Sequence, residues 1–581
     1  MTRYMRWPTR EVAIGDCPLG AHHSIRVQSM ATTDTLDIEG TVAQSIRIIE
    51  AGADYVRITA PSIKHAEALE PIKKQIRAHG YSTPIIADIH FTPNAAELAA
   101  RIVEKVRVNP GNYADKKKFE KIEYSQADYQ AEIERIRQRF TPLVHICKEY
   151  GTAMRIGTNH GSLSDRIMSR YGDTPIGMVE SAMEFVRICE DEGFHDIVLS
   201  MKASNPIVMV HAYRLLVQHM IESGRDYPLH LGVTEAGEGL DGRIKSAIGI
   251  GTLLEDGLGD TIRVSLTEEP EAEVPVAKAL VERYVKRVSH EPIEPLVVVP
   301  KDMFSYGRRE TQPVANIGGL HVPVVMIRNR SVVSSTDEPS ADYVVADDGA
   351  IVSTSDAMVR FEHVSADDLN KFINTARTTY EDVLTLSTTH EQAMPSLRRA
   401  IFHLMEVGIR TPVIAHRTYR TGDLGALMLH SATDLGALLL DGLIDGIWIE
   451  CPDVSSEDLL DISFAILQAT RTRITRTDFI SCPSCGRTLF DLQVTSAAIR
   501  AKTDHLKGLK IAIMGCIVNG PGEMADADYG YVGSGPEKVS LYKGKEIVKR
   551  NVPTASALDE LIALIKEHGD WVEAAVAEEV S

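Results

Sequence analysis

Short apolar runs of β-type composition recur along the first half of the chain, and stretches with helical spacing lie between them. Several helical stretches end at glycine, as VAQSIRIIEAG does over residues 42–52. Eight such runs fall within the first 265 residues, at 25–30, 54–59, 84–89, 104–109, 153–158, 196–201, 229–234 and 260–265. Their number and spacing are typical of a (β/α)8 barrel of the TIM type, with a doubly wound open sheet as the alternative.

Polar side chains gather at the ends of these runs, where a barrel would bring them to one mouth. They are Arg57, Asp88, His90, Arg107, Asn109, Arg155, Asn159, Lys202, Ser204, Arg263 and Ser265. Barrel enzymes bind ligands at this end of the strands, and the planar guanidinium group matches the geometry of phosphate oxygens. A glycine-rich stretch at 234–251 adds backbone N–H groups and a helix N-terminus that could hold a phosphate. The pattern predicts a multiply anionic, phosphorylated ligand.

The middle of the chain contains an echo of the barrel. After a proline-rich joint at 290–300, residues 436–449 (GALLLDGLIDGIWI) match residues 251–264 (GTLLEDGLGDTIRV) at eight of fourteen positions. We interpret the segment as a partial copy of the barrel, convergent α/β packing being the alternative. Trp448 stands where the barrel has Arg263, so we expect the copy to be structural rather than a second active site.

The last hundred residues form a different unit. KIAIM at 510–514 is typical of a buried strand, and the sequence around Lys543 and Gly544 predicts a hairpin turn. Residues 555–569 (ASALDELIALIKEHG) have the spacing of an amphipathic helix that closes the unit. We therefore expect a small α+β domain at the C-terminus.

The seven cysteines are unevenly distributed. Four lie among apolar or helical residues, where we expect buried, inert thiols: Cys17, Cys147, Cys189 and Cys451. The other three lie in the C-terminal unit, Cys482 and Cys485 in SCPSCGR and Cys516 in MGCIVNGPGE. Three cysteines this close in one small unit predict a metal centre.

The ligand set leaves two kinds of metal open. Structural zinc is held by four ligands, commonly two Cys-x-x-Cys pairs, and the second pair is missing here, although His505 could complete a zinc site. Iron–sulfur clusters use thiolates, and three of them leave one iron for a further ligand. Glu523 follows Cys516 beyond a Gly-Pro-Gly turn and could be that ligand. The spacing of the cysteines disfavours a radical-SAM enzyme.

Composition narrows the class of protein. The chain has 581 residues with 62 Lys+Arg, 81 Asp+Glu and a formal charge of −19, which argues against broad nucleic-acid binding. Apolar runs are shorter than the ~18 residues of a membrane span, and the start lacks a signal-peptide core. We therefore expect a cytoplasmic protein that binds neither membranes nor nucleic acid.

In combination, the motifs resemble a known enzyme family. SCPSCGR, MGCIVNGPGE and ADYGYVG, joined to a barrel with VQSM, DYVRIT, ADIHF, VRVNPGN, RIGTNHGSL and SMKAS, are similar to the 4-hydroxy-3-methylbut-2-enyl diphosphate synthases of the methylerythritol phosphate route. The resemblance covers residues 1–290 and 476–581. The segment between them looks like the insert of the long form. The resemblance implies three domains: a barrel (1–290), a barrel-like insert (291–475) and an iron–sulfur domain (476–581).

The resemblance also implies the site and its chemistry. It implies one 4Fe–4S cluster held by Cys482, Cys485, Cys516 and, without substrate, Glu523, which is also expected to be catalytic as an exchangeable ligand. The implied reaction opens the ring of 2-C-methyl-D-erythritol 2,4-cyclodiphosphate with loss of water and gain of two electrons from ferredoxin or flavodoxin. The diphosphate contacts carry over to Arg57, Arg107, Arg155, Asn159, Lys202 and Ser265. A homodimer is compatible with this reading.

Two other classes remain open at this point. One is a phosphate-ester isomerase or aldolase barrel with a structural zinc tail. The other is a non-catalytic regulatory protein that senses iron through its cluster and binds a partner through the insert.

Overall fold

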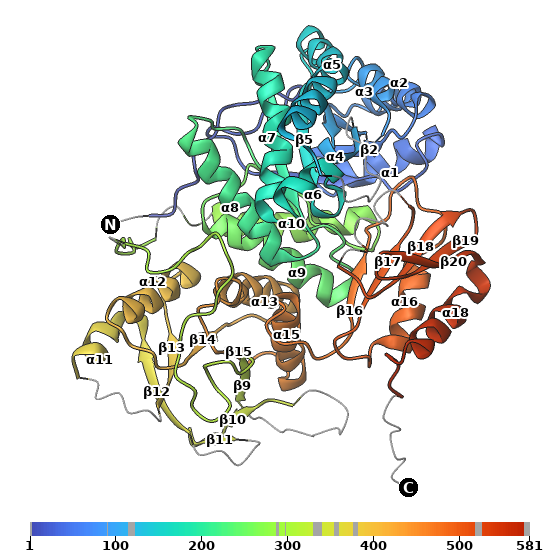
Figure 1. The fold of residues 1–581 in the computed structure, drawn as a ribbon. Helices are drawn as coiled ribbons and strands as arrows, with labels where there is room; N and C mark the ends of the chain where they lie inside the picture. Colours follow the sequence, from blue (N-terminus) through green and yellow to red (C-terminus); the bar gives the residue numbers. More distant parts are fainter. Residues whose placement is uncertain are drawn as a thin grey trace.

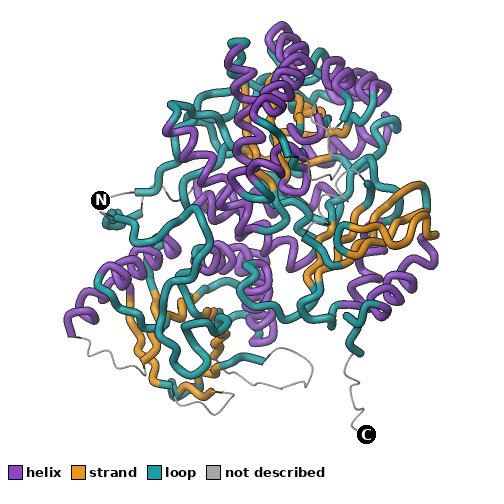
Figure 2. Tube along the Cα trace, viewed as in Figure 1, coloured by secondary structure: helices purple, strands orange, loops and turns teal. Residues whose placement is uncertain are grey.

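Three β-sheets, each with its own helices, follow one another along the chain in the computed structural model (Figure 1). The structure describes residues 3–89, 91–113, 123–285, 287, 290–296, 298–328, 340–353, 359–375, 382–517, 524 and 526–573. In Figure 2 the barrel strands are enclosed by helices, and the strands of the other two sheets lie apart from them. Each sheet falls within one of the three domains expected from the sequence, whose limits we retain as our proposed division.

The first sheet is a barrel of eight parallel strands in the order β6-β5-β4-β3-β2-β1-β8-β7. A parallel bridge between Leu199 and Leu229 brings the ends of this order together and nearly closes the ring. The strands are β1 (Arg26–Met30), β2 (Tyr55–Thr59), β3 (Ile85–Asp88), β4 (Lys105–Val108), β5 (Ala153–Asn159), β6 (Ile197–Lys202), β7 (His230–Leu231) and β8 (Thr261–Ile262). Each overlaps one of the eight predicted runs, so the predicted barrel is confirmed.

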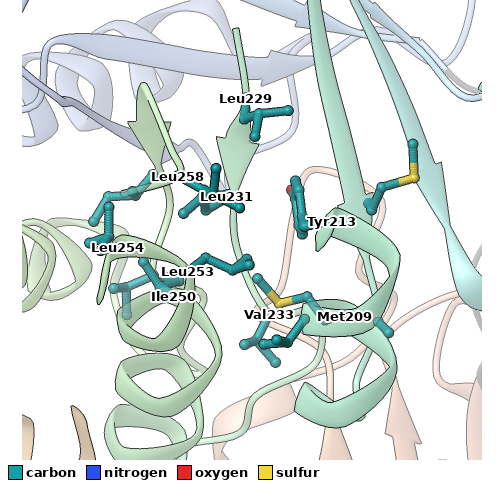
Figure 3. Close-up of a cluster of buried hydrophobic side chains, with 14 of the residues drawn as sticks. Met209, Tyr213, Leu229, Leu231, Val233, Ile250, Leu253, Leu254 and Leu258 are labelled. Carbon is teal, nitrogen blue, oxygen red and sulfur yellow. The ribbon is translucent and has the colours of Figure 1, made fainter. Parts of the chain in front are cut away.

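Helices cover the outside of the barrel and bury apolar faces against its strands. They are α1 (Ile38–Glu50), α2 (Ile63–Ala78), α3 (Pro93–Ala99), α4 (Pro110–Tyr113), α5 (Gln126–Tyr150), α6 (Asp165–Tyr171), α7 (Pro175–Asp191), α8 (Pro206–Glu222), α9 (Gly239–Glu255) and α10 (Pro270–Val285). Figure 3 shows Met209 and Tyr213 of α8 beside Leu231 of β7 and Leu253 of α9, all fully buried. Burial of this kind stabilises the fold by roughly 25 cal/mol for each Å² of apolar surface removed from water.

The insert has an open, mostly parallel sheet in the order β11-β10-β9-β15-β14-β13-β12, in which only β10 and β11 pair antiparallel. Its strands are β9 (Val324–Arg328), β10 (Tyr343–Val345), β11 (Ile351–Ser353), β12 (Arg360–Ser365), β13 (Asp382–Ser387), β14 (Val413–Thr418) and β15 (Gly446–Glu450). Its helices are α11 (Leu369–Thr375), α12 (Ala393–Glu406), α13 (Leu424–Ser431), the π-helical η4 (Ala432–Gly436), α14 (Ala437–Leu440) and α15 (Ser456–Ala469).

Strand order relates this sheet to the barrel. β12 to β15 follow one another as β5 to β8 do, and β9 and β10 continue beyond β15 as β1 and β2 continue beyond β8. In the described part of the chain, nothing corresponds to β3 and β4, and the edge strands β11 and β12 do not pair with each other. This strand order supports our interpretation of the insert as an opened, partial copy of the barrel. Trp448 of β15 is buried in an apolar cluster on this sheet, which supports a structural role.

The two echoing segments pack against each other. Gly251 of α9 and Gly436 of η4 are equivalent positions of the echo, and each lies against the opposite helix. A Cβ atom on Gly251 would lie 2.3 Å from Thr433 Cγ2, and one on Gly436 would lie 2.5 Å from Ile248 Cγ1. Thr433 and Ile248 each precede the equivalent glycine by three residues, so the contact is reciprocal, as in a two-fold interface.

Buried ion pairs at this interface follow the same symmetry. Asp256 and Asp441 are also equivalent in the echo. Arg214 of α8 contacts both carboxylates, at 2.9 Å and 2.7 Å, and Arg398 of α12 contacts both, at 2.8 Å and 2.7 Å. Each arginine compensates both aspartates, so separating one of the four charges would leave its partners buried and uncompensated. The cluster therefore favours one relative orientation of barrel and insert.

The duplication extends to the segments that precede each sheet. Asp260 accepts hydrogen bonds from Arg6 and Thr9 at 2.6 Å and 2.9 Å. Its equivalent in the echo, Asp445, accepts hydrogen bonds from Arg308 and Thr311 at 3.0 Å and 3.1 Å. The copy therefore begins well before the segment in which the sequence reveals it.

The C-terminal domain has a five-stranded sheet in which β16, β17 and β18 are parallel and β18, β19 and β20 are antiparallel. Its elements are β16 (Asp478–Ser481), α16 (Leu492–Thr503), β17 (Lys510–Met514), β18 (Tyr529–Gly535), β19 (Lys538–Lys543), β20 (Glu546–Pro553) and α18 (Thr554–Glu567). The predicted strand, hairpin and closing helix are all present.

The scattered cysteines differ in exposure. Cys147, Cys189 and Cys451 are buried as expected, and burial raises the pKa of the Cys147 thiol to about 12. The expectation is wrong for Cys17, which is only half-buried because it lies in the turn between the bridged residues Val12 and Leu19. Within the described ranges, every helix is too short or too polar to cross a membrane.

A side chain at Gly251 should disturb the interface between barrel and insert. We expect Gly251→Leu to lower the urea midpoint of unfolding by the equivalent of about 1–3 kcal/mol, because an overpacked contact must shift its neighbours. Gly422→Leu is the matched control, since a Cβ atom there has no neighbour within 4 Å. Equal midpoints for the two variants would contradict the tight contact.

Candidate active site

A cavity lies between the barrel mouth and the C-terminal domain of the same chain. Its barrel wall comes from the carboxyl ends of the strands, and its opposite wall comes from the segments that follow β16 and β17. The lining residues are Met30, Arg57, Arg107, Arg155, Asn159, Lys202, Thr234, Glu235, Arg263, Ser265, Cys482, Pro483, Ser484, Cys485, Arg487, Thr488, Met514 and Cys516. Strand ends and cysteine loops thus face a common space.

The barrel wall brings together all six residues expected to contact a diphosphate. Arg57 lies on β2, Arg107 on β4, Arg155 and Asn159 on β5, Lys202 at the end of β6, and Ser265 after β8. Parallel barrel strands end at the same mouth, so residues distant in sequence converge there. Arg263, which the sequence also marked, lines the same wall and is held by Glu273 at 3.0 Å and 3.1 Å. His90 lies outside the described residues.

Positive charge dominates the wall. Among the described residues that line the cavity, six are cationic and one, Glu235, is a carboxylate. Burial, and after it the repulsion of neighbouring guanidinium groups, holds the pKa of Arg155 and Lys202 well below the ordinary values. A buried excess of cations costs free energy that a bound anion would offset. The wall is therefore suited to a multiply charged anion.

The opposite wall carries three thiols. Cys482 directly follows β16 and accepts a hydrogen bond from the Gly515 N–H at 3.3 Å, while Cys516 follows β17. β16 and β17 are parallel neighbours, so their carboxyl ends place these cysteines at one edge of the sheet. Burial raises the pKa of Cys482 to about 12. The pKa of Cys485 is lowered, first by a hydrogen bond with Cys516 and then by the charge of Arg487.

The cysteine wall offers a set of three thiol donors. Within the described residues, no group of three or more Cys, His, Asp or Glu side chains is placed as the ligands of one metal ion would be. His505 does not line the cavity; it hydrogen-bonds the Val572 carbonyl at 2.9 Å and packs on Trp571. Thiolates are the ligands that iron–sulfur clusters use, so the chemistry of the three cysteines fits such a group. Glu523, the expected fourth ligand, lies outside the described residues.

Direct contacts join the two walls. Ala236 of the barrel forms a parallel bridge with Ser481 of β16, and the Thr267 hydroxyl donates to the Cys482 carbonyl at 3.1 Å. Asp241, in the first turn of α9, binds Arg500 at 3.1 Å and also pairs with Arg476. The cysteine-bearing domain is thus held over its own barrel.

The glycine-rich stretch at 234–251 contacts other protein groups where helix α9 begins. The Gly239 N–H at the start of α9 donates to Glu268 at 3.0 Å, and the first turn of the helix contacts the C-terminal domain through Asp241. The N–H group at the start of α9 is therefore satisfied by a protein carboxylate, whereas Thr234 and Glu235 of the same stretch line the cavity. A phosphate contact from this stretch stays a prediction. Sequence reasoning missed the contact with the C-terminal domain because local composition does not reveal which surface a loop meets.

Two charged lining residues escaped the sequence analysis. Glu235 is buried and has a positive φ of 49°, which is uncommon outside glycine and typical of strained functional positions. Arg487 follows the cysteine pair and points into the barrel mouth. The only available signals were their positions, in the loop after the seventh strand and beside the Cys-x-x-Cys motif.

Comparison with known proteins gives two family models that match this chain. The GcpE TIM-barrel domain matches residues 9–278, and the GcpE protein C-terminal domain matches residues 478–567. Together the matched ranges contain every residue that lines the cavity, and the insert lies outside both.

Similar proteins extend over nearly the whole chain. A 4-hydroxy-3-methylbut-2-en-1-yl diphosphate synthase (flavodoxin) from Parabacteroides distasonis is 51% identical, covering 98% of this chain and 99% of its own. The enzyme of that name from Bacteroides fragilis is 48% identical, covering 98% and 97%. The chloroplastic 4-hydroxy-3-methylbut-2-en-1-yl diphosphate synthase (ferredoxin) of Arabidopsis thaliana is 44% identical, covering 99% and 89%.

Arg155 should matter for anion binding. We expect Arg155→Ala to weaken binding of inorganic pyrophosphate about 10- to 150-fold in calorimetric titration, because a charge-assisted contact contributes about 1.5–3 kcal/mol. Arg187→Ala, a change on the exposed side of α7, is the control and should leave the affinity unchanged. Wild-type affinity in Arg155→Ala would remove this residue from the anion site.

Proposed function

The chain belongs to the GcpE family, and from this premise we propose how its residues carry out the family's reaction. The protein is an oxidoreductase of the methylerythritol phosphate route to isoprenoids. It converts 2-C-methyl-D-erythritol 2,4-cyclodiphosphate to 4-hydroxy-3-methylbut-2-enyl diphosphate by reductive ring opening and dehydration. The observation that carries our assignment of the site is that strand-end cations and three cysteines line one cavity.

The barrel wall is our proposed diphosphate site. Arg57, Arg107, Arg155 and Lys202 would bind the phosphate oxygens, and Asn159 and Ser265 would add neutral hydrogen-bonding groups. Ring opening breaks a C–O ester bond of the cyclic diphosphate and leaves the ester oxygen as a free phosphate oxygen, so negative charge redistributes over the anion. Cations fixed beforehand in a buried wall stabilise that change without reorganising.

The cysteine wall is our proposed ligand set for one 4Fe–4S cluster. Cys482, Cys485 and Cys516 would supply three thiolates, and Glu523 remains our proposal for the exchangeable fourth ligand. When bound, the cluster supplies single-electron transfer and, at the iron without a cysteine, a Lewis-acid position. A carboxylate suits that position because it is a harder and more exchangeable ligand than a thiolate.

Proton supply is the remaining requirement. The overall reaction consumes two electrons and two protons for each water released, and the departing hydroxyl group must gain one of these protons. Glu235 is the carboxylate among the described lining residues, and Asp88 behind them is already engaged by arginines. We therefore assign Glu235 as the general acid of this step.

Electrons come from outside the chain. The names of the relatives specify flavodoxin or ferredoxin, and we propose a small electron-transfer protein of this class as the electron donor here. We also propose that the enzyme acts in the cytoplasm. The described lining residues come from both domains of one chain, and we propose that the site closes within the chain, whether or not a homodimer forms.

An anaerobic assay with the cyclic diphosphate and a chemical reductant tests the function, and mixing inactive chains tests the site. We expect a mixture of Arg155→Ala and Cys516→Ser proteins to remain inactive, since each chain closes its own cavity. The wild-type protein under the same reductant is the positive control. Recovery of activity in the mixture would mean that the working site forms between chains.

Loss of a cysteine ligand should remove the cluster. We expect anaerobically reconstituted wild-type protein to contain iron and sulfide with broad visible absorption, and Cys516→Ser to lose most of both. Glu523→Ala should still assemble a cluster on three cysteines but lose most turnover. Cys189→Ser, at a buried position of α7, is the control and should retain iron. Stoichiometric zinc without sulfide in the wild type would sink the proposal.

Glu235→Gln should separate proton supply from binding. The amide fills the same space but cannot donate a proton to a leaving hydroxyl, so we expect kcat to fall about 100- to 10,000-fold, with substrate affinity nearly unchanged. Glu269→Gln, an exposed change before α10, is the matched control. A variant with full turnover would exclude Glu235 as the acid.

A further inference from the structure

Asp88 lies behind the barrel wall of the cavity, where side chains of both domains reach it. It ends β3 and is fully buried. Its Oδ1 atom lies 2.6 Å from a guanidinium nitrogen of Arg57 and 3.2 Å from one of Arg107. Its other oxygen lies 3.7 Å from Arg487 of the C-terminal domain. One buried carboxylate therefore contacts both the proposed phosphate-binding arginines and an arginine of the cysteine loop.

Gly486 allows the cysteine loop to reach this carboxylate. A Cβ atom at Gly486 would lie 2.4 Å from the Thr33 carbonyl oxygen and 2.9 Å from the Thr59 hydroxyl, so only glycine fits against the barrel rim. The next residue, Arg487, then enters the barrel mouth, where its side chain is 11% exposed. Arg487 lines the same cavity as Cys485 and Cys516, and it lies two residues after Cys485 in the same loop.

Arg487 is therefore shared between a carboxylate and two expected cluster ligands. An anion bound by Arg57 and Arg107 would draw their charge away from Asp88, and the less compensated carboxylate would attract Arg487 more strongly. Arg487 would then donate less to the cysteine sulfurs. Hydrogen bonds to the sulfurs set the potential of an iron–sulfur cluster, and weaker ones favour its oxidised state.

We propose that Arg487 is a positioning residue that couples occupancy of the anion site to the redox potential of the cysteine-held group, with Asp88 as the link. The inference rests on the proposed function, because it needs a redox group on the three cysteines. Coupling of this kind is reciprocal, so the oxidised protein binds the anion more tightly than the reduced protein does. The affinity for the anion therefore depends on the redox state of the group on the opposite wall of the cavity.

The test measures binding and potential rather than turnover. Inorganic pyrophosphate is titrated into oxidised and dithionite-reduced reconstituted protein, and midpoint potentials are measured with and without it. In the wild type we expect dissociation constants at least about fivefold higher in the reduced state. Arg487→Gln and Asp88→Asn should each reduce this ratio about threefold or more, leaving the part caused by direct repulsion.

Midpoint potentials without ligand should move in opposite directions. Arg487→Gln removes a cation from the sulfurs and should lower the potential, whereas Asp88→Asn leaves Arg487 to the sulfurs and should raise it. The Asp88→Asn/Arg487→Gln double variant should have the same binding ratio as either single variant, because both changes break one link. Effects that multiply in the double variant would overturn the proposal.

Glu273→Gln is the charge-matched control. It removes a buried carboxylate that holds another lining arginine, Arg263, and whose hydrogen-bond partners in the described part of the chain, Ser29, Arg263 and Leu266, all belong to the barrel. It should keep the wild-type ratio, and an equal loss in this variant would overturn the link. If Asp88→Asn does not fold, a wild-type ratio in Arg487→Gln alone overturns it. A wild type without iron or turnover would instead sink the proposed function.

Discussion

Buried positive charge at the barrel mouth is the constraint on which the rest of the structure depends. Among the described residues, six cationic side chains and one carboxylate line the cavity. Behind the barrel wall, Asp88 pairs with Arg57 and Arg107, and Glu273 pairs with Arg263. Such a wall is costly to bury and becomes favourable when an anion occupies it. The opposite wall contributes thiols that would carry negative charge as cluster ligands, so the two domains are complementary before any substrate enters.

Helix α9 holds this arrangement together (Figure 1). Its first turn pairs with the C-terminal domain through Asp241, whereas its last turns contact the insert through Gly251 and, just beyond the helix, Asp256. One rigid element of the barrel thus fixes both neighbouring domains. A change at the insert interface would therefore reach the cavity through α9, although the insert contributes no residue to the lining among those described.

The insert keeps the framework of the barrel and loses its chemistry. Equivalent glycines, aspartates and arginines form reciprocal contacts across the interface, as two copies of one protein do around a two-fold axis. Trp448, however, stands at the position equivalent to Arg263 of the barrel, and its ring stacks on His416 with ring centroids 3.8 Å apart. The cations at its strand ends, Arg328 of β9 and Arg417 of β14, are paired with the carboxylates of Glu450 and Asp434. The opened sheet is therefore better suited to support the barrel than to bind a diphosphate.

The sequence by itself determined the elements and the residues whose convergence follows from them. Period and spacing revealed eight barrel strands, and because parallel strands end at one mouth, Arg57, Arg107 and Arg155 could be grouped without a structure. Spacing also identified the three cysteines. Only the tertiary structure decided that Arg487 enters the barrel beside Asp88, that Glu235 lines the cavity, and that the glycine-rich stretch contacts the C-terminal domain. Local patterns encode how a segment folds and which of its faces is buried. They do not encode which distant surface will meet that face, because that depends on the shapes and charges of two domains at once.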